Sequence, residues 1–208
     1  MELYKYGFES WWSLLNDSTC VSHLNSIIEK LKDEYAYHKV YPSKTNIFRA
    51  FRETPINNCK YILLGMDPYP NEYKGVPSAC GLSFVTENGY VNPSLRILCK
   101  SLNIETSEFK DYMLSKGVLL LNSALTLRAK ETGSHLKLWA PFTQNLIQTI
   151  STNKPEIIWI LLGKSAQNFK QYINTTNIVE APHPVSYVYS GNTDYTELKE
   201  MFKKLNWL

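Results

Sequence analysis

Four apolar runs divide the chain, and segments with helical spacing lie between them. The runs are "KYILL" (60–64), "GVLLLNSALTL" (117–127), "EIIWILLGKSA" (156–166) and "TNIVEAPHP" (176–184). Their apolar parts are continuous rather than alternating, which is typical of strands covered on both faces. The intervening segments are "NPSLRILCKSL", "APFTQNLIQTIS" and "SAQNFKQYI". Strands that alternate with helices predict βαβ units, and therefore an α/β fold with a central, mostly parallel four-stranded sheet flanked by helices.

Helical patterns dominate the N-terminal quarter of the chain. Over residues 9–36 apolar positions recur at helical spacing, and the clearest stripe consists of Val21, Leu24, Ile27, Ile28 and Leu31. A further short helix is predicted to start at Ile47 and Phe48 and to stop at Pro55. Because 208 residues suit one domain, we expect a single domain that spans 1–208.

Polar or turn-forming residues follow the apolar part of each predicted strand. In chain order they are Asp67 with Tyr69, Asn122, Lys164 with Ser165, and His183. In a parallel α/β sheet the ligand site lies outside the carboxyl ends of the strands. Any one of these residues alone would suit an ordinary loop. Together they predict one pocket that holds a carboxylate, a phenol, an amide and an imidazole.

The chemistry of such a pocket suits a flat, polar ligand. The Asn122 amide carries both a donor and an acceptor, as pairing with the edge of a base requires. An imidazole stabilises negative charge that builds up on a leaving group, and a carboxylate orients water or stabilises a cation. Because "LLGKS" lacks the upstream glycine of a phosphate-binding P-loop, a nucleotide-binding α/β protein is the weaker interpretation.

Composition and charge exclude only a few classes of protein and of partner. The net charge of +3 and the pI of about 8.5 permit nucleic acid as a partner without requiring it. The four cysteines lack CxxC spacing and the four histidines are dispersed, so we expect no disulfide framework, no metal and a reducing compartment. His135 is expected to be structural, with Ser134 as a nearby helix N-cap. We find no signal-peptide pattern and no apolar run approaching about 20 residues, and therefore expect neither secretion nor a membrane span.

Several ordered segments resemble motifs of the uracil-DNA glycosylase family. "GMDPYP" is similar to that family's GQDPYH motif, "GLSF" to GLxFS and "NPSL" to its proline-rich loop. "GVLLLNSALTLRAKETGSHLKLWAPFT" resembles its second core motif, "LLGKSAQ" its Gly-Ser loop and "APHPVS" its HPSPLS segment. The resemblance implies a DNA repair enzyme without a cofactor. Such an enzyme flips uracil out of DNA and hydrolyses its N-glycosidic bond, leaving an abasic site.

The resemblance also implies roles for individual residues. Asp67 matches the catalytic aspartate, which stabilises the oxocarbenium-like sugar and positions the attacking water. His183 matches the histidine that hydrogen-bonds uracil O2, and Asn122 matches the asparagine that binds O4 and N3–H and rejects cytosine. Tyr69 matches the tyrosine that excludes the methyl group of thymine, and Phe84 the phenylalanine that stacks on the base. Taken singly, Asp67 also suits a turn and Phe84 a core position, so the combination carries the hypothesis.

Other matches imply contacts with DNA. Ser94, Gly163 and Ser165 match residues of the loops that pinch the phosphate backbone. Lys74, Arg128 and Lys164 are further candidates for phosphate contacts, with solvated-surface roles as the alternative.

The sequence departs from the family within the first motif and just after it. Met66, assigned to uracil binding, replaces a glutamine, which is tolerable if that position acts through its backbone N–H. Pro70 replaces the motif's histidine, which approaches the DNA backbone, so one phosphate contact is expected to be lost; a poxviral branch of the family resembles this sequence there. The segment "NEYKGVPSAC" stands in place of the family's GPGQAHG.

The largest departure is "HPVSYVYSGN", where the family has a leucine that wedges into the duplex. Counting without a gap places Tyr187 at that position, whereas a two-residue deletion matches Val185 and Ser186 to the family's Leu-Ser. We favour Tyr187, or its neighbours Val188 and Tyr189, as the wedge, because an aromatic ring can stack in the vacated space.

Two functions compete at this stage. The first is an active uracil-DNA glycosylase, and the alternative is a DNA-binding polymerase processivity or scaffold protein with weak or secondary glycosylase activity. The expected partner is single- or double-stranded DNA that contains uracil, with a proteinaceous glycosylase inhibitor or a polymerase as further candidates. We expect a monomer, located in the cytoplasm if the source is bacterial or at the site of DNA replication in an infected host cell if it is viral.

Overall fold

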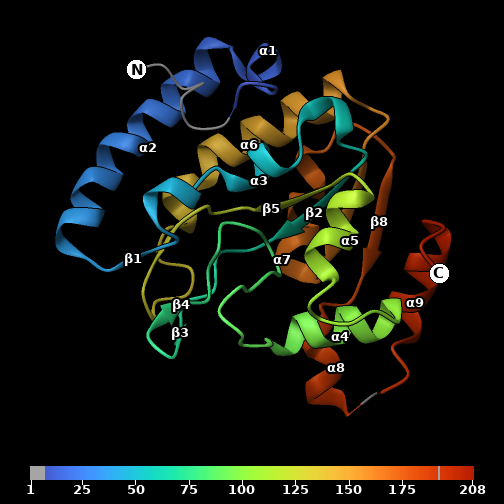
Figure 1. Ribbon diagram of the computed structural model, residues 1–208. Coiled ribbons are helices and arrows are strands. Elements are labelled where there is room, and N and C mark those ends of the chain that lie inside the picture. Colours follow the sequence, from blue (N-terminus) through green and yellow to red (C-terminus); the bar gives the residue numbers. More distant parts are fainter. Residues whose placement is uncertain (1–7, 192) are drawn as a thin grey trace.

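A parallel sheet of four strands forms the centre of the protein (Figure 1). The structure, a computed structural model, describes residues 8–191 and 193–208, so the expected domain span of 1–208 includes residues outside the described ones. The sheet order is β5-β2-β7-β8. The strands are β2 (Tyr61–Gly65), β5 (Val118–Asn122), β7 (Ile158–Leu162) and β8 (Ile178–Ala181). Each falls on one of the four apolar runs, and the predicted fold class is confirmed.

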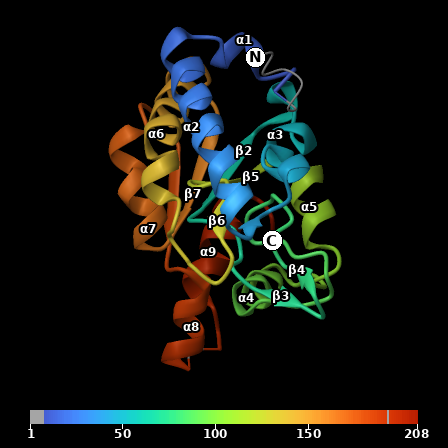
Figure 2. The same ribbon diagram turned by 90° about the vertical axis from the view of Figure 1, so that its left-hand side faces the viewer.

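Helices surround this sheet. They are α1 (Trp12–Leu15), α2 (Ser18–Tyr37), α3 (Arg49–Glu53), α4 (Pro93–Leu102), α5 (Phe109–Ser115), α6 (Leu136–Asn153), α7 (Lys164–Gln167), α8 (Pro184–Ser190) and α9 (Thr196–Lys204), with 3-10 turns η2 (Lys44–Asn46), η3 (Ile56–Asn58) and η4 (Asn168–Tyr172). Figure 2 shows α6 and α7 on one side of the sheet and α3 and α5 on the other. All five residues of β5 are buried between these layers, which explains its continuous apolar run. None of the helices described in the structure has the length and apolar character that a membrane crossing needs.

Two helical segments differ from the sequence prediction. The segment predicted as one helix after β7 is a short α7 followed by the 3-10 turn η4. The helix α6 begins at Leu136 with His135 in the cap position, and no side chain caps it. The predicted N-cap Ser134 is therefore wrong. Its hydroxyl instead accepts a hydrogen bond of 2.9 Å from the backbone N–H of Arg128.

Two small sheets escaped the sequence analysis. In one, β1 (Val40–Tyr41) pairs antiparallel with β6 (Leu127–Arg128). In the other, β3 (Glu72–Tyr73) pairs with β4 (Val76–Pro77) across a two-residue turn. Strands of two residues are too short for a periodicity signal. The turn, Lys74 and Gly75, has φ of +51° and +77°, the left-handed geometry that tight hairpins use.

The strand register brings the functional ends together. Gly65 at the end of β2 lies beside Asn122 at the end of β5, and Leu162 of β7 lies beside Ala181 of β8. Because all four strands are parallel, their carboxyl ends reach the same edge of the sheet. Figure 1 places α4, α8 and the β3–β4 hairpin around that edge.

Candidate active site

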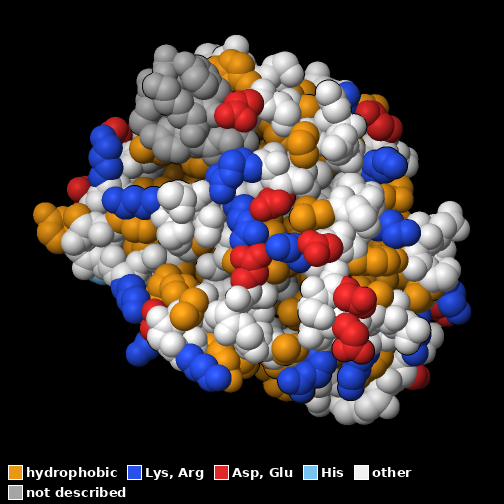
Figure 3. All heavy atoms as spheres, in the orientation of Figure 1, with side chains coloured by type: hydrophobic (Ala, Val, Ile, Leu, Met, Phe, Trp, Pro, Cys, Tyr) orange, Lys and Arg blue, Asp and Glu red, His pale blue; other side chains and the backbone are white. Residues whose placement is uncertain are grey.

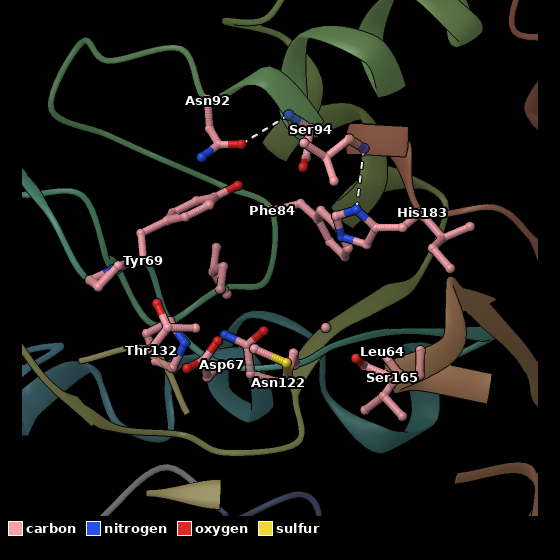
Figure 4. A pocket seen from close by; sticks show the side chains of 18 of the residues that line it. Leu64, Asp67, Tyr69, Phe84, Asn92, Ser94, Asn122, Thr132, Ser165 and His183 are labelled. Atoms are coloured by element: carbon pink, nitrogen blue, oxygen red, sulfur yellow. Dashed lines mark hydrogen bonds between the residues drawn. The ribbon is translucent and has the colours of Figure 1, made fainter. Parts of the chain in front are cut away.

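A cavity of about 460 Å³ lies at the carboxyl ends of the strands. Of the residues singled out from the sequence, its lining includes Met66, Asp67, Tyr69, Pro70, Phe84, Ser94, Asn122, Ser165 and His183. Figure 4 shows Asp67, Tyr69, Asn122 and His183 arranged around this space. The convergence expected from the strand ends therefore occurs, for every strand of the central sheet.

Asp67 follows β2, and a hydrogen bond from a loop distant in the sequence holds its carboxylate. The backbone N–H of Gly133 donates a hydrogen bond of 2.6 Å to its Oδ2. Burial raises the pKa of the Asp67 carboxyl above its usual range, and the Gly133 N–H partly offsets this increase. The result is a single partly desolvated carboxylate with one oxygen held and the other available to a ligand.

Asn122 ends β5 with its amide at the bottom of the cavity. It is 8% exposed, and among the described residues its side chain has no hydrogen-bond partner. The amide sits against Gly65, where a Cβ would lie 2.2 Å from Asn122 Oδ1. Only glycine leaves room for the amide there. Its donor and its acceptor are thus both available to a ligand.

His183 is held as a neutral hydrogen-bond donor. It occupies the N-cap of α8, and its Nδ1 accepts a hydrogen bond of 3.2 Å from the backbone N–H of Val185. An Nδ1 that accepts carries no proton, which assigns the proton to Nε2. Burial also lowers the pKa of His183 below its usual value, which favours the same neutral form.

Gly163, at the end of β7, lets His183 sit where it does. Its φ is +80°, and a Cβ there would lie 2.5 Å from the Cβ of His183. Both facts exclude larger residues, the first through backbone strain and the second through steric overlap. Gly163 was assigned to DNA contact, but it does not line the cavity; what the structure shows is its packing against His183.

Two aromatic side chains line the cavity. The Phe84 ring is buried and its centroid lies 6.1 Å from that of the His183 ring, with 37° between the planes. Phe84 has a φ of +62°, unusual for a bulky residue. The Tyr69 hydroxyl is buried and has no hydrogen-bond partner among the described residues. Burial raises the pKa of Tyr69, so the phenol stays neutral.

The residues assigned to DNA differ in their positions. Ser94 is buried near the start of α4, and its N–H donates to the side chain of the N-cap residue Asn92. Ser165 is exposed at the edge of the cavity. Lys164 and Ser186 are exposed outside the lining, and the Ser186 hydroxyl donates to the carbonyl of His183. Their contacts with DNA stay predictions.

The expected wedge Tyr187 does not fit its position. It is 5% exposed, and its hydroxyl donates a hydrogen bond of 2.8 Å to Glu197 of α9. Tyr189 and Val188, by contrast, are 84% and 52% exposed. Tyr187 therefore anchors α8 to α9, whereas its neighbours Val188 and Tyr189 are open to solvent. Which of these side chains enters a duplex stays a prediction.

Some residues of the site escaped the sequence analysis. Asn92, just before Pro93, is a recognisable N-cap and could have been found from that signal. Gly133 could not, because it is 66 residues from Asp67 in the sequence. Its segment is anchored by His135, whose Nδ1 and Nε2 bond Thr126 (2.8 Å) and Glu34 (3.2 Å) outside the cavity lining.

Comparisons with known proteins identify the family. The sequence matches the Uracil DNA glycosylase superfamily over residues 51–206. It is 35% identical over 195 residues to a uracil-DNA glycosylase of Francisella philomiragia, with 88% of each chain covered. A crystal structure of UNG from Nitratifractor salsuginis superposes with a TM-score of 0.73 at 22% identity, over 99% of this chain and 94% of that one. The mimivirus uracil-DNA glycosylase gives a TM-score of 0.70 at 24% identity, over 86% and 68%.

The fold and the cavity define an α/β protein with a pocket for one flat, polar base at the ends of its strands. This chain belongs to the uracil-DNA glycosylase family. The family consists of DNA repair hydrolases that cleave N-glycosyl bonds. Membership supports excision of uracil and not the alternative of a processivity or scaffold protein. Within the described residues, no group of three or more His, Cys, Asp or Glu is placed to hold a metal ion.

Proposed function

We propose that this protein excises uracil from DNA by hydrolysing the bond between uracil N1 and C1′ of the deoxyribose, leaving an abasic site. One observation carries the proposal: the Asp67 carboxylate, the Asn122 amide and the neutral His183 imidazole face one cavity (Figure 4). A base inside a duplex cannot reach this cavity, so the nucleotide has to be flipped out of the stack.

Asn122 and Tyr69 select uracil. The Asn122 amide accepts from N3–H and donates to O4, and Gly65 leaves the space that this amide occupies. Cytosine presents a donor where uracil has O4 and an acceptor where uracil has N3–H, so it would leave both groups of the buried amide unpaired. The Tyr69 ring, carried between Pro68 and Pro70, closes the cavity where the methyl group of thymine would lie.

His183 and Asp67 stabilise the charges that form as the bond breaks. The electron pair of the C1′–N1 bond moves onto the uracil ring, and Nε2–H of His183 donates to O2, where negative charge grows. A preorganised donor of this kind contributes about 3–4 kcal/mol in comparable sites. The sugar becomes cationic, and the Asp67 carboxylate stabilises it and orients a water molecule. The oxygen of this water forms the new bond to C1′, and the carboxylate accepts the proton that the water gives up.

A release assay tests the proposal. Oligonucleotides that carry uracil, cytosine or thymine at one position are incubated with the protein, and abasic sites are detected by alkaline cleavage. We expect strand cleavage only at uracil. The Tyr69→Ala variant should in addition release thymine, because the wall that excludes its methyl group is gone. Absence of cleavage at uracil with micromolar protein would refute the proposed function.

We also propose that the same cleft accepts a proteinaceous inhibitor. Crystal structures of mimivirus UNG variants in complex with UGI support this, the nearer having a TM-score of 0.73 at 25% identity. Inhibition of uracil release by stoichiometric UGI would test it, and unchanged release at a large excess of UGI would contradict it.

A further inference from the structure

A second cavity lies beside the active-site pocket. Its volume is about 540 Å³, within the range of about 300–1,000 Å³ that ligand sites occupy. We call it the Tyr73–Tyr90 groove, and its lining includes Lys39, Tyr41, Pro70, Tyr73, Tyr90 and Lys130. Pro70 lines both cavities. A DNA strand that leaves the uracil pocket across Pro70 therefore enters this groove.

Two tyrosine rings form an aromatic platform in the groove. Tyr73 and Tyr90 are 36% and 39% exposed, and their ring centroids lie 5.8 Å apart with 37° between the planes. The amine of Lys74 lies 5.3 Å from the Tyr73 ring centroid. Neither tyrosine belongs to the hydrophobic core. Exposed aromatic faces of this kind stack on the bases of single-stranded nucleic acid with little regard for sequence.

The platform is held in place before any ligand arrives. The Asn88 Nδ2 donates hydrogen bonds of 2.9 Å to the Val76 carbonyl and to the Ser78 hydroxyl, and Asn88 Oδ1 accepts one of 3.1 Å from the N–H of Tyr90. Val76 pairs with Tyr73 in the β3–β4 hairpin. Asn88 thus ties the segments that carry the two rings to each other, so that little order has to be gained on binding.

The charges around the groove suit a phosphate backbone. Lys39 is paired with Glu72 at 2.6 Å, and the pair is neutral. Lys74 and Lys130 form no direct ion pair among the described residues, although the charge of Lys130 helps to lower the pKa of Glu72. Three lysines around one glutamate leave a net positive charge. The backbone N–H of Lys130 donates to the Pro70 carbonyl at 2.9 Å, so this lysine is anchored at the boundary between the cavities. In Figure 3 basic and hydrophobic side chains lie next to one another over β3 and β4.

We propose that the Tyr73–Tyr90 groove binds the nucleotide next to the flipped uridine, with its base stacked on the tyrosines and its phosphate near Lys130. The inference rests on the proposed function, because it needs a uridine in the neighbouring pocket. It gives a function to "NEYKGVPSAC" (71–80), the segment after the first motif that differs from the family's GPGQAHG. A contact beyond Pro70 replaces the one that the missing histidine would have made.

A comparison of variants and substrates tests the groove. We would measure steady-state kinetics on a single-stranded oligonucleotide with one uracil, and on two versions with an abasic analogue on its 5′ or its 3′ side. The double variant Tyr73→Ala/Tyr90→Ala should raise KM by about 5- to 100-fold, the loss expected for one stacked base, with little change in kcat. The control Tyr73→Phe/Tyr90→Phe keeps both rings and should behave like the wild type.

The abasic substrates separate stacking from other effects. With the wild type, one of the two abasic substrates should raise KM about as much as the double alanine substitution does on the intact substrate. With the double alanine variant, the same abasic substrate should raise KM no further. An unchanged KM for the alanine variant, or an equal additional loss on the abasic substrate, would overturn the proposal.

A binding measurement keeps the test valid if catalysis is absent. If the wild type released no uracil, the proposed function would fail, but the groove would still be tested by fluorescence anisotropy with a labelled oligothymidylate. Weaker binding by the alanine variant than by the phenylalanine variant supports the groove, and equal binding refutes it. In the same assay Lys130→Gln should reduce the salt dependence of log K by about 0.7, the value for one phosphate contact on a single strand.

Discussion

The floor and the rim of the uracil pocket are built differently. On the floor, Asp67, Asn122 and His183 come from strand ends or the residues just after them. A hydrogen bond from the Gly133 N–H holds Asp67, and Asn122 and His183 pack closely against Gly65 and Gly163. On the rim, helix α8 presents Tyr189 and Val188 to solvent with 84% and 52% exposure. The floor holds few atoms in fixed positions, whereas the rim offers side chains that can move. This difference suits a reaction that needs precise placement of charge but has to bind irregular, opened DNA.

The contrast implies that floor variants change the chemical step and rim variants change the handling of the duplex. Hydrogen bonds and close packing hold the floor groups near the geometry of the reaction. Exposed rim residues act only when DNA is bound. The following variants test that separation.

The largest effect is expected for Asp67→Asn. The variant should lower the single-turnover excision rate by about 10²- to 10⁴-fold, because it removes the charge that stabilises the sugar cation and orients water. The Gly133 N–H can still donate to the new amide oxygen, so the fold should persist. A loss of less than tenfold would contradict the role of Asp67.

The same variant should be more thermally stable than the wild type. The pKa of Asp67 is raised in the folded protein, so this carboxyl favours folding below its unfolded pKa and loses that contribution as pH rises through its folded pKa. At neutral pH the ionised, partly buried group therefore destabilises the fold, and asparagine removes that cost. Melting temperatures at pH 7 check the sign, and a lower value for the variant would contradict it.

Gly163→Ala should act on the chemical step through its contact with His183. A Cβ there would lie 2.5 Å from His183 Cβ and should displace the imidazole, lowering kcat by about 10- to 100-fold. The matched control is Gly89→Ala, which has φ of +82° against +80° at Gly163 but nothing within 4 Å of the added Cβ. Both variants should lose about 1–2 kcal/mol of stability from the left-handed backbone. If the two lowered kcat equally, strain rather than the contact with His183 would be responsible.

The pH profile should show one acidic limb. Burial raises the pKa of the Asp67 carboxyl and lowers the pKa of the His183 imidazole, so both active forms, the carboxylate and the neutral imidazole, are lost as pH falls. We expect kcat/KM to fall by about tenfold per pH unit on the acidic limb and to stay level on its alkaline side. A rate that increased on acidification through pH 6.5 would show that the imidazolium is the active form.

The sequence predicts the floor better than the rim for a physical reason. Continuous apolar runs reveal parallel strands, and parallel strands carry their last residues to one edge, so Asp67, Asn122 and His183 could be placed together without coordinates. The Gly133 contact depends on how a distant loop packs. On the rim, one helical residue turns the side chain by about 100°. Sequence alignment across an altered loop cannot resolve which of several adjacent residues faces DNA.

The smallest effect is expected on the rim. Tyr187 and Tyr189 are two residues apart on α8, about 200° around the helix, which explains why one is buried and the other exposed. Tyr189→Ala should lower excision from double-stranded DNA by about fivefold, the weak end of the loss of one stacked contact, and leave single-stranded substrate unchanged. Tyr187→Phe loses only the hydrogen bond to Glu197 and should lower stability by about 1 kcal/mol without changing either rate.

Excision rates on matched single- and double-stranded substrates show which residue of α8 enters the duplex. If Val188→Ala selectively slowed duplex excision while Tyr189→Ala did not, the wedge would be Val188. If neither variant distinguished the two substrates, α8 would not enter the duplex. The proposal that rim residues handle the duplex while floor residues carry out the chemical step would then be wrong.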